Sequence, residues 1–122
     1  MNTQLCIVIR HGPYGMIHAA EALRVAGGTT INGLQTNILL IEDGVFVAKE
    51  DQNAEKAGWR SLHAVLKQFL ALFGHRGLRV YVHEDSARTR GLETGDFVGG
   101  VEILPAAETA KVVSESDVVA MF

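Results

Sequence analysis

The chain has one cysteine, Cys6, and a thiol can act as a nucleophile or carry sulfur. Cys6 lies between Leu5 and Ile7, within an apolar run that extends from Leu5 to Ile9. A reactive thiol must be exposed, and a cation or a helix N-terminus must lower its pKa. The apolar neighbours of Cys6 instead predict a small buried side chain that takes no part in chemistry.

A second candidate follows the same run, because Arg10-His11-Gly12 stands directly after it. This tripeptide resembles the phosphate-handling Arg-His-Gly of histidine phosphatases, in which the histidine accepts a phosphoryl group and arginines neutralise the oxyanion. The polar residues that usually follow in that family are replaced by Pro13-Tyr14-Gly15, and the chain is short for that fold. A histidine in a turn is therefore the favoured interpretation, and an enzyme that uses His11 is the less favoured alternative.

Metal and nucleotide chemistry are not indicated. Gly27-Gly28 follows an expected helix rather than a strand, so it lacks the context of a phosphate-binding loop. Histidines and carboxylates show no i, i+4 ligand spacing, and we expect neither a metal nor a cofactor. The histidines concerned stand at positions 11, 18, 63, 75 and 83.

The elements that position these residues alternate between strand and helix. Apolar, β-branched runs predict strands, and stripes with three- and four-residue steps predict helices. The expected strands are Leu5–Ile9, Asn37–Ile41, Leu78–Val82, Val101–Leu104 and Val118–Phe122. The expected helices are Tyr14–Ala26, closed by Gly27-Gly28; Ala54–Phe73, capped by Asn53 and ended by Gly74; Ser86–Arg90; and Pro105–Glu115.

This alternation predicts an α/β fold made of three α/β/α layers, with a mainly parallel five-stranded sheet. The 122 residues fit one domain, residues 1–122. In such sheets ligands sit beyond the carboxyl ends of the strands. The candidate site residues at these ends are His11, Tyr14, Asp43, His83, Glu84 and Ser86.

Two of these segments have a simpler structural interpretation. Glu84 and Asp85 suit the start of a helix, where carboxylates cap the chain and meet the helix dipole. The apolar segment Val45–Ala48 follows a turn, where loops are usually polar. It either packs on its own domain or forms an interface through Val45, Phe46 and Val47.

Charge and hydropathy exclude several partners. The net charge is −3 and no Lys/Arg cluster is present, which argues against direct nucleic-acid binding. No apolar stretch approaches the roughly 20 residues that cross a bilayer, so no membrane partner is expected. One cysteine cannot form an internal disulfide, and we expect a cytoplasmic protein.

Several stretches, in order along the chain, resemble one family. Pro13-Tyr14-Gly15 is followed by Glu21-Ala22-Leu23, and Asp43-Gly44-Val45-Phe46 follows the second strand. The segment from Val80 to Ser86 leads to Arg90-Gly91-Leu92, and the chain ends Ser116-Asp117-Val118-Val119-Ala120-Met121-Phe122. The combination resembles the DsrE/DsrF-like sulfur-relay family, most of all its DsrF/TusC branch.

The resemblance implies an α/β/α fold and an oligomer. Members commonly form heterohexamers of DsrE-, DsrF- and DsrH-type (TusD-, TusC- and TusB-type) subunits, which pass sulfur as a protein persulfide. The sulfur serves tRNA thiolation in one setting and sulfur oxidation in another. The carrier cysteine of DsrE/TusD-type subunits lies eight residues before the glycine of Arg-Gly, and the matching position here is His83.

An imidazole cannot form a persulfide, so the carrier role does not transfer to this chain. The resemblance therefore implies a non-catalytic DsrF/TusC-like subunit that gives structure and a docking surface to DsrE/TusD-type and DsrH/TusB-type partners. His83 would then sit beside a partner's cysteine. The alternative is a free-standing homo-oligomer that binds a small ligand at His11, Asp43 and His83.

Overall fold

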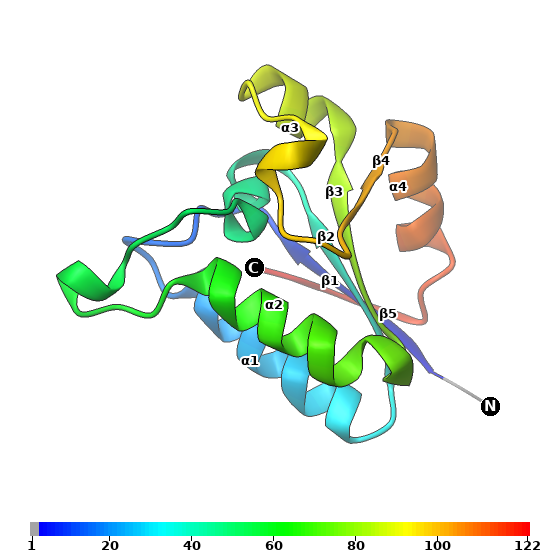
Figure 1. The fold of residues 1–122 in the computed structure, drawn as a ribbon. Coiled ribbons are helices and arrows are strands. Elements are labelled where there is room, and N and C mark those ends of the chain that lie inside the picture. Colours follow the sequence, from blue (N-terminus) through cyan, green and yellow to red (C-terminus); the bar gives the residue numbers. More distant parts are fainter. Residues whose placement is uncertain (1–2) are drawn as a thin grey trace.

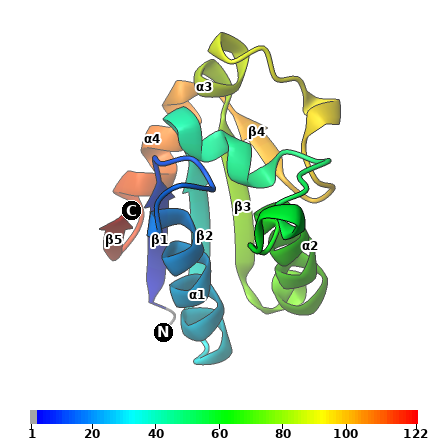
Figure 2. The same cartoon turned by 90° about the vertical axis from the view of Figure 1, so that its left-hand side faces the viewer.

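A computed structural model describes residues 3–122, and its centre is a sheet of five strands in the order β4-β3-β2-β1-β5. Every pair of neighbouring strands is parallel, which confirms the parallel sheet predicted from the sequence. In Figure 2 the sheet runs from β5 on the left to β4 on the right. The strands are β1 (Gln4–Ile9), β2 (Gln35–Leu40), β3 (Leu78–His83), β4 (Glu102–Leu104) and β5 (Val118–Met121).

Helices cover both faces of this sheet, so the three-layer α/β/α architecture is confirmed. Helices α1 (His18–Ile31) and α2 (Leu62–Phe73) lie side by side on one face, and α4 (Ala106–Ser114) lies on the other (Figure 1). The short α3 (Glu84–Thr89) continues directly from β3. The short 3-10 helices are η1 (Glu42–Ala48), η2 (Glu55–Ala57), η3 (Gly74–Arg76) and η4 (Thr94–Asp96).

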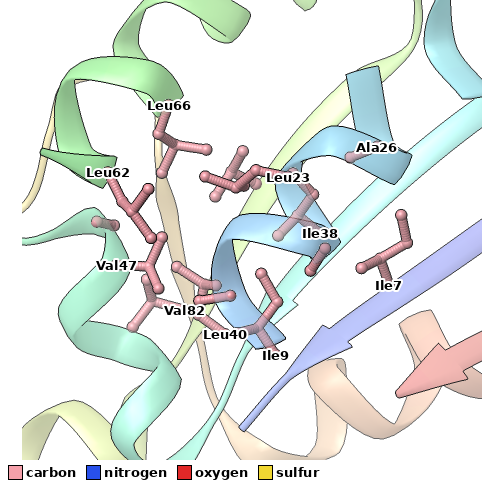
Figure 3. Packing of buried hydrophobic residues seen from close by; sticks show 14 of the residues in the cluster. Ile7, Ile9, Leu23, Ala26, Ile38, Leu40, Val47, Leu62, Leu66 and Val82 are labelled. Carbon is pink, nitrogen blue, oxygen red and sulfur yellow. The ribbon is translucent and has the colours of Figure 1, made fainter. Parts of the chain in front are cut away.

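The apolar runs are continuous because the central strands are buried on both faces. On β1, Ile7 and Ile9 point into the core under α1 and α2, whereas Cys6 and Val8 join a smaller cluster beneath α4. Figure 3 shows the larger core, where leucines of α2 meet α1, the strands and η1. Burial of each Ile or Leu side chain in this larger core contributes about 1.5–3 kcal/mol to the free energy of unfolding, so this core supplies most of the fold's stability.

Helix α1 differs from the prediction at both ends. The expected helix Tyr14–Ala26 instead spans His18–Ile31, and Gly27-Gly28 lies inside it rather than closing it. A β-carbon on Gly27 would lie 3.0 Å from the ring of Phe69, so this glycine lets α2 pack closely against α1. The sequence therefore suggested the end of a helix at a glycine whose role is close packing between two helices.

The predicted long helix Ala54–Phe73 is broken, and Asn53 does not cap it. In the first part of this range only the short helix η2 is present, and it ends at Gly58, which has a left-handed φ of 83°. Helix α2 begins at Leu62, with Ser61 as its N-cap residue. The Glu55 carboxylate accepts hydrogen bonds from Ser61, from the backbone N–H at 2.7 Å and from the hydroxyl, and these hold the pKa of Glu55 below its ordinary value. Trp59, which lies within the expected helix, is 51% exposed in the connecting loop.

Helix α2 ends at Phe73 as predicted and Gly74 follows as its C-cap, but Gly74 is right-handed, with φ −58°. The left-handed turn comes later, at Gly77 with φ 96°, after the added turn η3. The remaining expected elements are present with shifted ends: α3 begins at Glu84 rather than Ser86, and β5 ends at Met121.

The apolar segment after β2 packs on its own domain as η1. Val45 and Val47 are fully buried in the core, so they have no surface for the partner contact considered from the sequence, and only Phe46 remains partly exposed. Gly44 makes this possible, because a β-carbon there would overlap the carbonyl oxygen of Ile9 and lie 2.7 Å from its carbonyl carbon. The backbone of η1 thus lies directly against the carboxyl end of β1.

We predict that Gly44→Ala destabilises the protein by at least about 1–3 kcal/mol, because the added methyl must displace backbone rather than a flexible side chain. Urea unfolding followed by circular dichroism measures this. The matched control is Gly28→Ala, since Gly28 lies inside α1 with open space around it. It should gain about 0.5–1 kcal/mol. Equal unfolding midpoints for Gly44→Ala and the parent would contradict the close approach.

Candidate functional site

The carboxyl ends of β2 and β3 are joined through Ser86. Its hydroxyl accepts a hydrogen bond from the backbone N–H of Glu42 at 2.9 Å and lies 2.7 Å from Nδ1 of His83. The backbone N–H of Ser86 also donates to Nδ1 of His83, at 3.3 Å. Because Nδ1 accepts the Ser86 backbone N–H, it carries no proton, and the Ser86 hydroxyl donates its hydrogen to it.

This network fixes the state of His83. With Nδ1 acting as an acceptor, the ring proton of the neutral imidazole lies on Nε2. The same acceptor caps the first turn of α3, in which His83 is the N-cap residue. Nε2 makes no hydrogen bond within residues 3–122, so it remains as an N–H donor.

A shallow pocket of about 310 Å³ adjoins this histidine, between the ends of the strands and α4. Most of its wall is apolar, and Glu42, His83, Ser86 and Thr109 supply the polar groups. The Ser86 hydroxyl is already occupied by Glu42 and His83, so it is not a free nucleophile. The pocket can therefore receive a small group, and His83, whose Nε2 has no hydrogen-bond partner in residues 3–122, is one of its lining residues. Its lining residues are Leu39, Ile41, Glu42, His83, Ser86, Thr109, Ala110 and Val113.

The acidic candidates are paired with arginines. Asp43 accepts from Nε of Arg90 at 2.9 Å, and Arg90 also donates to the carbonyl of Ser86 at 3.2 Å. Asp85 pairs with Arg88 at 2.6 Å, and Glu84 lies 3.9 Å from the same guanidinium. The Asp43–Arg90 pair links η1 to the end of α3, and the Arg88 pairs lie within α3. Such exposed pairs contribute little stability.

Tyr14 has a structural role. Its hydroxyl donates to the side-chain oxygen of Gln52 and accepts from the backbone N–H of Leu62 at 3.0 Å. The Gln52 amide in turn donates to the carbonyls of Phe46, Val47 and Lys49. Gln52, which no sequence signal singled out, thus links the loop after β1 to η1 and to the start of α2.

His11 lies apart from this network. Its ring stacks on His18, with centroids 4.2 Å apart and planes at 20°. Nδ1 of each ring is buried without a partner among the described residues. No hydrogen bond or ion pair in residues 3–122 joins His11 to Asp43 or to His83, so the structure does not bring the three predicted residues into one linked site.

Cys6 is fully buried in β1, as its apolar neighbours predicted. Burial raises the pKa of its thiol, and a hydrogen bond with Ser116 offsets part of that rise. The folded protein thus favours the neutral thiol, which is a poor nucleophile. Within residues 3–122, no group of three or more His, Cys, Asp or Glu side chains is arranged to hold a metal, and no helix there is long and apolar enough to cross a membrane.

We predict that Cys6 does not react with a chromogenic aromatic disulfide until the protein unfolds. Absorbance of the released thiolate, followed with and without denaturant, measures this. Stability should also fall as the pH rises above the ordinary pKa of a thiol, because the unfolded chain then ionises Cys6 while the folded chain does not. Rapid stoichiometric labelling of the native protein would contradict the buried position.

Comparison with known proteins places this geometry in a family. A model of the DsrE/DsrF-like family matches residues 3–121. An uncharacterized protein of Methanopyrus kandleri is 34% identical over 118 residues, covering 97% of this chain and 93% of that protein. The intracellular sulfur oxidation protein DsrF of Allochromatium vinosum is 28% identical over 127 residues, covering 93% of this chain and 91% of that protein.

Solved structures share the fold. The ychN protein of E. coli has a TM-score of 0.78 at 22% identity, with all of both chains covered. A protein of unknown function from Methanobacterium thermoautotrophicum has a TM-score of 0.74 at 10% identity, with 99% of this chain and 100% of that chain covered. Since the family model spans residues 3–121 and the α/β/α layers are those the resemblance implied, this chain belongs to the DsrE/DsrF-like family.

Proposed function

We propose that the protein is a non-catalytic, DsrF/TusC-like subunit of an intracellular sulfur-relay complex, with a structural and docking role beside DsrE/TusD-type and DsrH/TusB-type partners. The family assignment and the similarity to a protein named for intracellular sulfur oxidation support a place in sulfur metabolism. The observation that carries the non-catalytic role is the absence of an accessible thiol. The only cysteine has no exposed surface, and residue 83 is histidine.

Chemistry explains why these two facts matter together. In persulfide transfer a thiolate attacks the outer, sulfane sulfur of the donor, a new S–S bond forms, and the donor sulfur leaves with the electron pair of the broken bond. Nitrogen in an imidazole cannot take the place of that thiolate. Cys6 cannot reach a donor without opening the sheet between β2 and β5.

His83 nevertheless supplies a useful group to a partner. Its Nε2–H is free of hydrogen bonds among the described residues, and the ring lines the shallow pocket. A hydrogen bond from this donor stabilises the thiolate or persulfide anion of a partner cysteine placed there. In this proposal the subunit tunes a partner's sulfur and carries none itself.

The edge strand β5 is the favoured docking surface. In the parallel register Val119 is paired with Cys6 and Met121 with Val8, so both point to the face beneath α4. Helix α4 packs on β3 and β4 and reaches the Cys6 and Val8 cluster, yet Val119 and Met121 on β5 remain 41% and 59% exposed. Parallel sheets are normally covered on both faces, so a partner that covers β5 completes the layer that α4 leaves open.

We predict that the native chain gains no sulfur when it is incubated with polysulfide, whereas His83→Cys gains the mass of one sulfur atom. The half-buried position at the end of β3 exposes a thiol that the donor can reach. Intact-protein mass spectrometry with and without dithiothreitol measures the reducible adduct.

The double variant Cys6→Ala/His83→Cys is the matched control, and it should gain the same sulfur as His83→Cys. A persulfide on Cys6 in the native, folded protein would show that this chain is a carrier and would end the proposal.

We predict that Val119→Lys and Met121→Lys each weaken co-purification with DsrE- and DsrH-type partners at least about tenfold, since a charge would be buried in an apolar contact. Co-expression with tagged partners and quantitative elution measures retention. Leu72→Lys is the control, because Leu72 is 59% exposed on α2, on the opposite face. Full retention by both β5 variants would refute this docking surface, and a lone homo-oligomer without partners would favour the free-standing alternative.

A further inference from the structure

A groove separate from the strand ends lies between the N-terminal halves of α1 and α2. Its volume is about 380 Å³, within the roughly 300–1,000 Å³ of small-molecule pockets. Leu23, Val65 and Phe69 form much of its apolar wall. The loops before the two helices complete it with Tyr14 and Trp59.

Two aromatic side chains at this groove are exposed to solvent. Trp59 is 51% exposed and Tyr14 37%, although both could have been buried in a chain this apolar. The Tyr14 hydroxyl is fixed by Gln52 and Leu62, so its ring is held in place at the wall of the groove. Rigid aromatic walls bind flat apolar groups at a small cost in side-chain entropy.

The charged residues that line the groove are of one sign. Arg24 and Arg60 line it and no carboxylate does, although the chain as a whole carries a net charge of −3. Arg24 pairs with Glu21 at 2.8 Å in an exposed contact. Arg60 has no ion pair within residues 3–122, and the nearby Glu55 carboxylate is committed to Ser61.

We propose that this groove binds a small amphipathic anion, with an aromatic or branched apolar body and one carboxylate. The body would lie against Leu23, Phe69 and Trp59, and the carboxylate would meet Arg60, with Arg24 as a second cation. A guanidinium without a partner recognises a carboxylate by charge-assisted hydrogen bonds, and a neutral or cationic analogue gains nothing there. This site is independent of His83 and of any sulfur partner.

The test is a charge series on one apolar body: phenylpropionate, phenylpropionamide and phenylpropylamine. Trp59 is the only tryptophan, so its emission reports directly on the groove. We expect a saturable change with the carboxylate, binding weaker by about fivefold or more with the amide, and weaker still with the amine. Two-dimensional NMR of the same titrations locates the contact.

Two matched pairs of variants test the residues. Arg60→Gln should weaken phenylpropionate binding about fivefold, whereas Arg76→Gln removes the same charge from an exposed turn away from the groove and should leave binding unchanged. Ala20→Phe should abolish binding, because Ala20 is exposed and lines the groove. Ala107→Phe on α4 is its control.

Each other outcome overturns the proposal. Equal affinity for the acid, the amide and the amine would show an apolar surface without charge selection. No saturable change with any of the three would show that the groove takes no such ligand. A Trp59 emission that shifts with protein concentration alone, and an assembly that Ala20→Phe dissolves, would show that a second copy of the chain covers this groove.

Discussion

The close approach of Gly44 to the carbonyl of Ile9 is the constraint on which the rest of the structure depends. The same carbonyl oxygen accepts the backbone N–H of Ile41 at 3.1 Å, so the ends of β1 and β2 and the start of η1 meet at one point. From there η1 turns Val45 and Val47 into the core beneath the helix layer. A side chain at position 44 would push η1 outward and open the core that Figure 3 shows.

The placement of η1 also positions both candidate sites. Its first backbone N–H, at Glu42, donates to Ser86 and so couples the end of β2 to the His83 network. Its last carbonyls accept from Gln52, which holds Tyr14 and through it the first residue of α2. The strand-end pocket and the groove between the helices are therefore supported from opposite ends of one buried segment.

The sheet was predictable from the sequence because strands buried on both faces are continuous apolar runs, a signal that needs no tertiary information. The helix boundaries were less so. Gly27 was expected to end a helix but allows Phe69 to pack closely, and the expected helix Ala54–Phe73 is interrupted at Gly58. Both errors have one cause, since only the packed structure decides whether a glycine ends a helix or lets a neighbour approach. The candidate residues lie at the strand ends as predicted, but His11 stacks on His18, and β2 separates β1 from the β3 end that carries His83.

The side chain of His83 stabilises the turn from β3 into α3. The turn from β3 into α3 leaves the Ser86 backbone N–H in need of an acceptor, and Nδ1 of His83 supplies it while also accepting the serine hydroxyl. The hydroxyl is thereby oriented to accept from Glu42, which ties the turn to η1. A side chain without an acceptor at this position would leave the Ser86 N–H unpaired and the hydroxyl free to rotate. The imidazole thus stabilises the turn through one nitrogen and leaves the other as a donor, as the proposed docking role requires.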